Sequence, residues 1–378
     1  MDLKKIVLIP DSFKGTMSSG EVCSIMEKCI RRYYPKAEVV SIPVADGGEG
    51  SVDSFLAAVG GEILRMPCRG PYMEEIEGFY GIIDGGKTAV IEMAACAGLP
   101  LVRERLNPGK TTTYGVGELL ADASKKGCKK IIMGLGGSAT NDFGAGAAAS
   151  AGVRFFDKDG KSFIPVGETL SKIAKINKSG ICEELRRAQI ITMCDIDNPL
   201  YGENGAAYVF GPQKGADPKM AEYLDGQLRA VSETVKKELG IDVSNLKGAG
   251  AAGGMGAGMA AFFGSSLQMG LEVVLDTVGF DRLAQNADLI FTGEGKLDYQ
   301  SLRGKVVTGV ARRAKKLNIP VIAVAGQVDD NIESAYDEGV SAIFSIMRSA
   351  LPFDEVKHRC KADLNIAMDN IMRTIRLF

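Results

Sequence analysis

The sequence contains no tryptophan and a single histidine, His358, among its 378 residues. A Ser-His-Asp nucleophile system needs a histidine as its base, and many zinc sites are built from several histidines. His358 lies in a polar stretch near the C-terminus, where we expect a surface side chain. The sequence therefore excludes Ser-His-Asp chemistry and a histidine-rich metal site.

The cysteines are also arranged without a pattern. None of the eight belongs to a Cys-x-x-Cys pair, and their spacing is irregular. In a chain of this length such usage is typical of reduced thiols, several of them buried, in a cytosolic protein. We therefore expect a cytoplasmic protein.

Long apolar runs and an excess of one charge are missing as well. No apolar run approaches the ~20 residues that a membrane span needs, and the short run before Pro10 predicts a first strand rather than a signal peptide. The formal net charge is −2 and the pI is about 5.8, without a basic field. We expect neither a nucleic-acid nor a membrane partner, and the sequence carries no signal of an oligomeric state.

Glycine, by contrast, is abundant. The 47 glycines lie well above the average of about 7%, and they fall in tight clusters that indicate backbone-lined loops. Three clusters, residues 11–15, 46–50 and 293–298, combine acids with glycine, and two of them with lysine, directly after a predicted strand. Ligands of open α/β sheets bind outside the carboxyl ends of the strands. Acids, lysines and glycines there suit a phosphate, a metal ion and a small polar substrate, so the pattern predicts an enzyme.

Strands and helices alternate at both ends of the chain. Strand 5–10 precedes a helix that Ser18 and Glu21 are expected to cap, and strand 288–292 opens a similar alternation in the C-terminal third. This rhythm predicts a parallel sheet with right-handed crossovers. The middle of the chain differs, because residues 62–92 are predicted to form three strands, each with an alternating residue pattern, joined by short turns.

The predicted fold class is α/β. Residues 1–62 and 283–378 are expected to form one discontinuous, doubly wound domain of Rossmann or flavodoxin type, with residues 63–282 inserted as a second α/β domain. The prediction requires strands 5–10 and 288–292 to share a sheet. The cleft between the domains is the expected active site.

Two nucleotide-binding patterns need separate interpretation. Residues 81–88 match the Walker A pattern, but a strand follows the lysine where that motif needs a helix, so we interpret residues 84–87 as a hairpin turn. Residues 134–139 fit the dinucleotide fingerprint, with Asp157 as its distal acid. The glycines after Ala139 suit a helix poorly, so a phosphate-holding loop is the favoured interpretation and NAD binding is the alternative.

Four stretches together resemble the type I glycerate kinases. They are residues 11–15 with 46–50, residues 133–142, residues 194–202 with 209–215, and residues 293–298 with 301–305. The resemblance implies a bacterial enzyme that phosphorylates D-glycerate from ATP with Mg²⁺. It favours 2-phosphoglycerate as the product, and 3-phosphoglycerate is the other product that the two hydroxyls allow.

Residue roles follow from what phosphoryl transfer needs, namely positioning, cations on the phosphates and a carboxylate near the attacking hydroxyl. The expected catalytic residues are Asp195, Lys296 and Asp46, and the expected Mg²⁺ ligands are Asp195 and Asp197. The expected nucleotide-binding residues are Gly134, Gly136, Gly137, Ser138, Thr140 and Lys214. The expected glycerate-binding residues are Asp11, Lys14, Glu294, Ser301 and Arg303. On this assignment Gly136→Val weakens ATP binding and leaves the fold intact.

Structural alternatives stay open for several of these residues. Asp195 and Asp46 could be turn or helix caps, Lys14 and Lys296 could be solvated, and Lys214 could belong to a structural turn. The glycine run 248–258 is interpreted as close helix packing, with a second phosphate loop as its alternative. For the whole chain, the alternatives are a dehydrogenase of a small hydroxy acid and a non-catalytic nucleotide-binding regulator.

Overall fold

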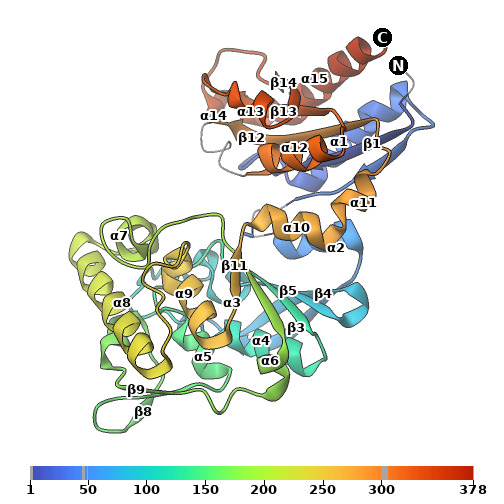
Figure 1. The fold of residues 1–378 in the computed structure, drawn as a ribbon. Coiled ribbons are helices and arrows are strands. Elements are labelled where there is room, and N and C mark those ends of the chain that lie inside the picture. Colours follow the sequence, from blue (N-terminus) through green and yellow to red (C-terminus); the bar gives the residue numbers. More distant parts are fainter. Residues whose placement is uncertain (1–2, 45–46, 49, 299–304, 378) are drawn as a thin grey trace. The chain divides into compact units, whose positions relative to one another are not determined.

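The computed structural model describes residues 3–44, 47–48, 50–298 and 305–377, and the chain divides into two compact units. Unit 1 comprises Met1–Asp46, Asp53–Gly60 and Leu271–Phe378, and unit 2 comprises Gly47–Val52 and Gly61–Gly270. Each unit contains its own sheet (Figure 1). No helix in the described part of the chain is long and apolar enough to cross a membrane.

Unit 1 is built on a five-stranded sheet in the order β14-β13-β12-β1-β2. The strands are β1 (Lys5–Pro10), β2 (Glu38–Ser41), β12 (Leu289–Leu297), β13 (Val321–Val328) and β14 (Val340–Ser345). All four pairings are parallel, and Ile6 of β1 lies opposite Leu289 of β12. The prediction that the first strand and the strand near residue 290 share a sheet is confirmed. Counted in chain order, the strands run 2-1-3-4-5, which is the flavodoxin order.

Helices bury the strands of this sheet. All residues of β1 after Lys5 are buried, as expected of a strand in a parallel sheet that is covered on both faces. Ile6 and Leu8 share a core with α1 (Ser19–Tyr33) and α15 (Cys360–Ile375), and α12 (Val306–Lys316) contacts β12 and β1. Ser18 and Glu21 form the predicted capping box at the start of α1.

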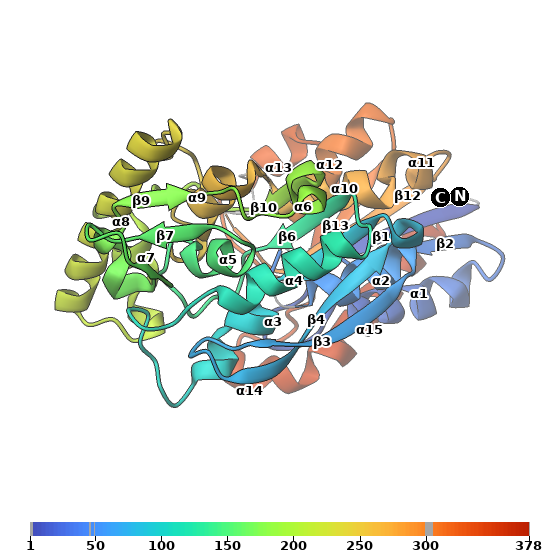
Figure 2. The same ribbon diagram turned by 90° about the horizontal axis from the view of Figure 1, so that it is seen from below.

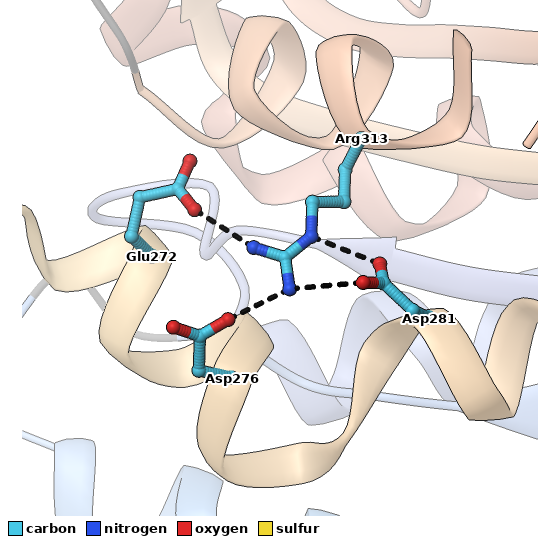
Figure 3. Close-up of polar contacts among 4 residues, drawn as sticks. All are labelled: Glu272, Asp276, Asp281 and Arg313. Atoms are coloured by element: carbon cyan, nitrogen blue, oxygen red, sulfur yellow. Dashed lines mark hydrogen bonds and ion pairs between the residues drawn. The ribbon is translucent and has the colours of Figure 1, made fainter. Parts of the chain in front are cut away.

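The shorter helices of unit 1 include α10 (Gly270–Val278), α11 (Phe280–Ala284), α13 (Ser334–Asp337) and α14 (Phe353–Val356). The first residue of α10, Gly270, is assigned to unit 2 and the rest of this helix to unit 1. Arg313 of α12 joins two of these shorter helices, because its guanidinium pairs with Glu272 and Asp276 of α10 and with Asp281 of α11 (Figure 3). The N···O distances are 3.0, 2.7 and 2.9 Å. The hydrogen bond to Asp281, with a smaller effect of Asp276, raises the pKa of the Arg313 guanidinium.

Unit 2 is built on a six-stranded sheet in the order β11-β10-β6-β5-β4-β3. Figure 2 labels β10, β6, β4 and β3 of this sheet. The strands are β3 (Glu62–Arg69), β4 (Glu75–Ile83), β5 (Thr88–Glu92), β6 (Lys130–Gly134), β10 (Gln189–Met193) and β11 (Ser266–Gln268). β3, β4 and β5 pair antiparallel, which confirms the three alternating strands predicted between residues 62 and 92. The other pairings are parallel, so this sheet is mixed.

A separate three-stranded sheet, β8-β7-β9, also lies in unit 2 and consists of β7 (Arg154–Phe156), β8 (Ser162–Phe163) and β9 (Lys175–Asn177). The helices of the unit are α3 (Ala94–Ala97), α4 (Tyr114–Lys125), α5 (Ala145–Ser150), α6 (Glu183–Arg187), α7 (Ala206–Phe210), α8 (Pro218–Leu239) and α9 (Ala251–Phe263). The core includes Phe262, whose ring makes edge-to-face contacts with Phe143 and Phe155. α2 (Ser51–Val59) begins in the short segment 47–52 of this unit.

Neither nucleotide-binding pattern has the local structure that its motif requires, as favoured from the sequence. Residues 84–86 form a single helical turn between the antiparallel strands β4 and β5, so the Walker-like lysine lies in a hairpin. No helix starts within the fingerprint 134–139, since α5 begins only at Ala145. Asp157 lies in the turn between β7 and β8, where its carboxylate accepts hydrogen bonds from the amides of Asp159 and Lys161.

The glycine run 248–258 packs against neighbouring backbone. A Cβ atom on Gly253 would lie 2.1 Å from the carbonyl oxygen of Thr140, and one on Gly258 would lie 2.0 Å from that of Phe143. Real Cβ atoms do not approach so closely, so these positions require glycine. The favoured interpretation, close packing, is confirmed for Gly253 and Gly258, but their neighbours belong to residues 140–143 and not to another helix.

Candidate active site

In unit 1, the first and third predicted motifs meet at the carboxyl ends of β1 and β12. The amide of Asp11 donates to the carbonyl oxygen of Gly293 over 2.8 Å. A Cβ atom on Gly295 would lie 3.3 Å from the amide nitrogen of Lys14, so the loop after β1 runs along β12. The strand order reverses between β1 and β12, and such a switch point is where open α/β sheets bind ligands.

The side chains at this switch point carry charges of both signs. Asp11 and Glu294 are buried, and the carboxylate of Asp11 accepts the amide of Ser12 at 2.6 Å. Lys14 is exposed on its loop. Three residues that were predicted separately from segments almost 300 residues apart are thus brought to one edge of one sheet.

The surroundings of Glu294 and Lys296 differ from the prediction. We expected both on a loop after a strand ending near residue 292, but β12 continues to Leu297. Glu294 and Lys296 lie opposite Ala325 and Gln327 of β13 in a parallel ladder. The expectation of a loop was wrong because the glycines of this stretch allow close approach to β13: a Cβ atom on Gly326 would lie 2.2 Å from the carbonyl oxygen of Gly295.

Lys296 is balanced by acids of its own unit. Its ammonium lies 2.7 Å from the carboxylate of Asp329 and 3.9 Å from that of Asp298, and about half of its side chain is exposed. The hydrogen bond to Asp329 raises the pKa of Lys296, so the side chain stays charged around neutral pH. It is therefore a fixed positive charge at the end of β12.

In unit 2, the predicted glycine-rich loop packs directly on the segment after Asp46. A Cβ atom on Gly134 would lie 2.6 Å from the carbonyl oxygen of Gly47, and one on Gly136 would lie 2.4 Å from the Cα atom of Gly48. The amide of Gly136 also donates to the Gly47 carbonyl over 3.0 Å. Gly134 and Gly136 are thus needed for backbone contact, and the expectation that Gly136→Val leaves the fold intact is contradicted.

The next residues of this loop are held by the end of α3 and the residues that follow it. The amide of Ala139 donates to the carbonyl oxygen of Ala97, and the amide of Leu99 donates to that of Gly137, each over 2.8 Å. Gly137 has a φ of 74°, which lets the chain reverse there. The amides of Gly136 and Ala139 are therefore occupied within the protein.

Lys214 is fully buried behind the loop. Its ammonium donates to the hydroxyl of Ser138 at 2.8 Å and to the carbonyl oxygen of Thr140 at 2.7 Å, and 1% of the residue is exposed. Burial lowers the pKa of Lys214 to about 7, although Asp142 opposes the shift. The side chain joins residues that are 74 and 76 positions away in the sequence.

Asp142 holds the end of the same loop. Its carboxylate is completely buried and accepts hydrogen bonds from the amides of Thr113, Gly144 and Gly146 and from the Thr113 hydroxyl. Burial raises the pKa of Asp142, against the lowering effect of these donors. This structural role of Asp142 was not predicted from the sequence, although an acid among small residues was the signal available.

Buried polar side chains without a partner also occur in this loop. Among the described residues, the Thr140 hydroxyl and both polar atoms of the Asn141 amide are buried and make no hydrogen bond to the protein. An unpaired buried polar group is costly, so such atoms usually bind water or a ligand group.

Glu92 organises the segment 47–52. Its carboxylate accepts hydrogen bonds from the amide of Val52 at 2.7 Å and of Gly50 at 3.2 Å, and the residue is 3% exposed. A carboxylate on the first amides of a helix acts as a cap, here for α2. Glu92, at the end of the buried strand β5, is therefore a paired acid.

Asp195 and Asp197 lie on the exposed segment that follows β10. One carboxylate oxygen of Asp195 accepts the amide of Gly270, the first residue of α10, at 2.7 Å. Asp195 therefore caps the start of α10, which is one of the structural alternatives considered from the sequence. Within the described ranges, no group of three or more His, Cys, Asp or Glu residues is arranged to hold a metal ion.

Three predicted site residues, Asp46, Ser301 and Arg303, lie outside the described residues.

The comparisons with known proteins assign nearly the whole chain to one family. The model of the glycerate kinase family matches residues 6–376. A glycerate kinase of Bacillus cereus (strain ATCC 10987 / NRS 248) is 45% identical over 368 residues, with 97% of each chain covered. A glycerate 2-kinase of Escherichia coli (strain K12) is 43% identical over 369 residues, 96% of this chain and 97% of that one.

A solved structure gives the same result for the fold. The crystal structure of a Salmonella typhimurium LT2 protein, provisionally assigned as glycerate kinase 2, matches with a TM-score of 0.89 and 39% identity over 99% of both chains. The dehydrogenase and the non-catalytic regulator are thereby set aside. The chain belongs to the glycerate kinase family and is an enzyme that phosphorylates glycerate.

Proposed function

We propose that this enzyme transfers the γ-phosphoryl group of ATP to the 2-hydroxyl of D-glycerate in a Mg²⁺-dependent reaction. The match of the glycerate kinase family over residues 6–376 is the observation that carries the proposal. The choice of the 2-position is supported by the Escherichia coli relative, which is named a glycerate 2-kinase.

The switch point of unit 1 supports the assignment of glycerate-binding residues. Lys14 and Lys296 supply two positive charges near the ends of β1 and β12, which suits the glycerate carboxylate or a phosphate oxygen. Asp11 and Glu294 supply buried acceptors, which suit the glycerate hydroxyls. Ser301 and Arg303 remain part of this proposed set.

The glycine-rich loop of unit 2 supports nucleotide binding through its backbone. Since the amides of Gly136 and Ala139 are occupied, the proposed donors to phosphate are those of Gly137 and Ser138, with Gly134 shaping the loop. The contacts of Lys214 favour a role in holding Ser138 and Thr140 in place instead of direct nucleotide contact.

The acids after β10 fit a loosely held Mg²⁺. This ion keeps several waters and is commonly bound by one or two carboxylates together with substrate phosphates, so a cluster of three protein ligands is not required. Asp195 and Asp197 would hold it, with Asp46 as a second candidate for the catalytic carboxylate. Bound there, Mg²⁺ would neutralise charge on the phosphates during transfer. The hydrogen bond from Gly270 fixes the Asp195 carboxylate in one orientation.

The test is phosphorus NMR of the product formed from ATP and D-glycerate with and without Mg²⁺. We expect 2-phosphoglycerate and a loss of turnover when EDTA is present. Formation of 3-phosphoglycerate would refute the assigned position, and full turnover in EDTA would refute the metal requirement. L-glycerate serves as the control for stereochemistry.

A further inference from the structure

Two thiols in the core of unit 2 lie unusually close together. The Sγ atoms of Cys68 in β3 and Cys96 in α3 are 3.1 Å apart, and both residues are buried. A disulfide bond is about 2.0 Å long, so closing this gap needs a movement of roughly 1 Å. The two cysteines are 28 residues apart in the chain, and no sequence pattern pairs them.

Two glycines make room for this thiol pair. A Cβ atom on Gly78 of β4 would lie 2.6 Å from the Cys68 sulfur and 2.8 Å from the Cys96 sulfur. A Cβ atom on Gly115 of α4 would lie 2.9 Å from the Cβ atom of Cys96. Any larger side chain at position 78 would push the sulfurs apart, so the close approach is a property of the packing around both cysteines.

The two thiols are chemically unequal. The hydrogen bond between them lowers the pKa of Cys68 and raises that of Cys96. Burial instead raises the pKa of other cysteines, to about 12 for Cys23 and about 11 for Cys194. Because the thiolate is the reactive form, Cys68 is the member of the pair suited to react first.

We propose that Cys68 and Cys96 form a reversible disulfide when the enzyme meets a peroxide. The Cys68 thiolate attacks one peroxide oxygen and becomes a sulfenic acid, while the other oxygen leaves as water. The Cys96 sulfur then attacks the Cys68 sulfur, an S–S bond forms, and the sulfenic oxygen leaves as a second water. Two thiols lose two hydrogens, and hydrogen peroxide is reduced to two waters. A dithiol reduces the disulfide back to two thiols by exchange and is itself oxidised to a disulfide.

The position of Cys96 connects this bond to the glycine-rich loop. Cys96 directly precedes Ala97, whose carbonyl oxygen accepts the Ala139 amide, and the following Gly98 pairs with Ser138 in a short bridge. A disulfide would draw α3 toward β3 and disturb these contacts. Oxidation is therefore expected to lower turnover, and reduction to restore it.

The experiment treats the full-length reduced enzyme with hydrogen peroxide and follows mass and turnover together. We expect loss of two hydrogens, a non-reduced peptide pair that contains Cys68 and Cys96, a severalfold loss of turnover, and recovery of both with dithiothreitol. Cys96→Ala should lose the cross-link and the reversible inhibition, whereas Cys128→Ala, a control at another buried thiol of the same core, should keep both.

Three results would count against the proposal. One is wild-type enzyme in which Cys68 and Cys96 both stay alkylatable after denaturation, although the half-buried thiols of Cys182, Cys194 and Cys360 have been oxidised. This result does not depend on how any variant folds. The second is a complete cross-link with unchanged turnover, which would refute the connection to the loop. Stable sulfinic acid on Cys68 without a cross-link would also count against it.

Discussion

Burial of the Lys214 ammonium should make the stability of the fold depend on pH in a defined direction. The folded-state pKa of Lys214 is about 7, and an unfolded lysine titrates near 10.4. Between these values the unfolded chain holds a proton that the folded chain has released, so raising the pH favours folding. Below pH 7 both states hold the proton, so Lys214 no longer makes the free energy of unfolding depend on pH.

The expected size follows from proton linkage. One proton of difference corresponds to ~1.4 kcal/mol per pH unit in the free energy of unfolding, hence ~2 kcal/mol between pH 8 and pH 9.5. Lys214→Met removes this contribution, so the difference between the wild-type and variant unfolding free energies should change by that amount over the interval. Because other groups titrate in the same range, only this difference is informative.

The assay is urea unfolding of both proteins at several pH values, with Lys219→Met as a control at an exposed lysine of α8. The control should follow the wild-type pH dependence. Parallel pH profiles for wild type and Lys214→Met would refute the reasoning, because they would mean that the buried ammonium has an ordinary pKa.

Three further predictions concern the acid after β10, the glycine-rich loop and the Arg313 cluster. Asp195→Asn should lower turnover by ~10²-fold or more with little change in Tm, since the amide oxygen can still accept the Gly270 amide; near-normal turnover would transfer the catalytic role to Asp46 or Asp197. Gly136→Ala should lower the unfolding free energy by roughly 1–3 kcal/mol because its Cβ would meet Gly48, whereas Gly226→Ala in open space on α8 should not destabilise; equal Tm values for the two would contradict the contact. Arg313→Met should cost roughly 1–2 kcal/mol, since its three partners are at least half exposed, and the loss should shrink in high salt; a salt-independent loss would point to packing instead of charge.

Much of the fold could be predicted because its signals are local. Ser18 and Glu21 are three residues apart, so the capping box at α1 follows from neighbouring residues alone. The hairpin at residues 84–86 follows equally from glycines between two strands. The alternation of strands with helices determined the parallel sheet of unit 1, since parallel strands need crossover connections.

The candidate site depended on contacts between distant segments. Lysine is usually a surface residue, and Lys214 is buried only because the fold places Ser138 and Thr140, more than 70 residues away, around its ammonium. The end of β12 is a second case. Its glycines suggested a loop, but pairing with β13 continues the strand through Lys296, and that partner lies about 30 residues further along the chain.

The glycines show most clearly the difference between what the sequence and what the tertiary structure determined. The sequence by itself determined that glycine clusters follow the strands, and this located the loops of the candidate site. Only the tertiary structure decided what each glycine is for: Gly136 accommodates Gly48, and Gly78 accommodates the sulfurs of Cys68 and Cys96. The physical reason is that a glycine, which has no Cβ atom, leaves room for another atom to lie close to the backbone. The sequence shows where that room is, but only the folded chain determines which atom fills it.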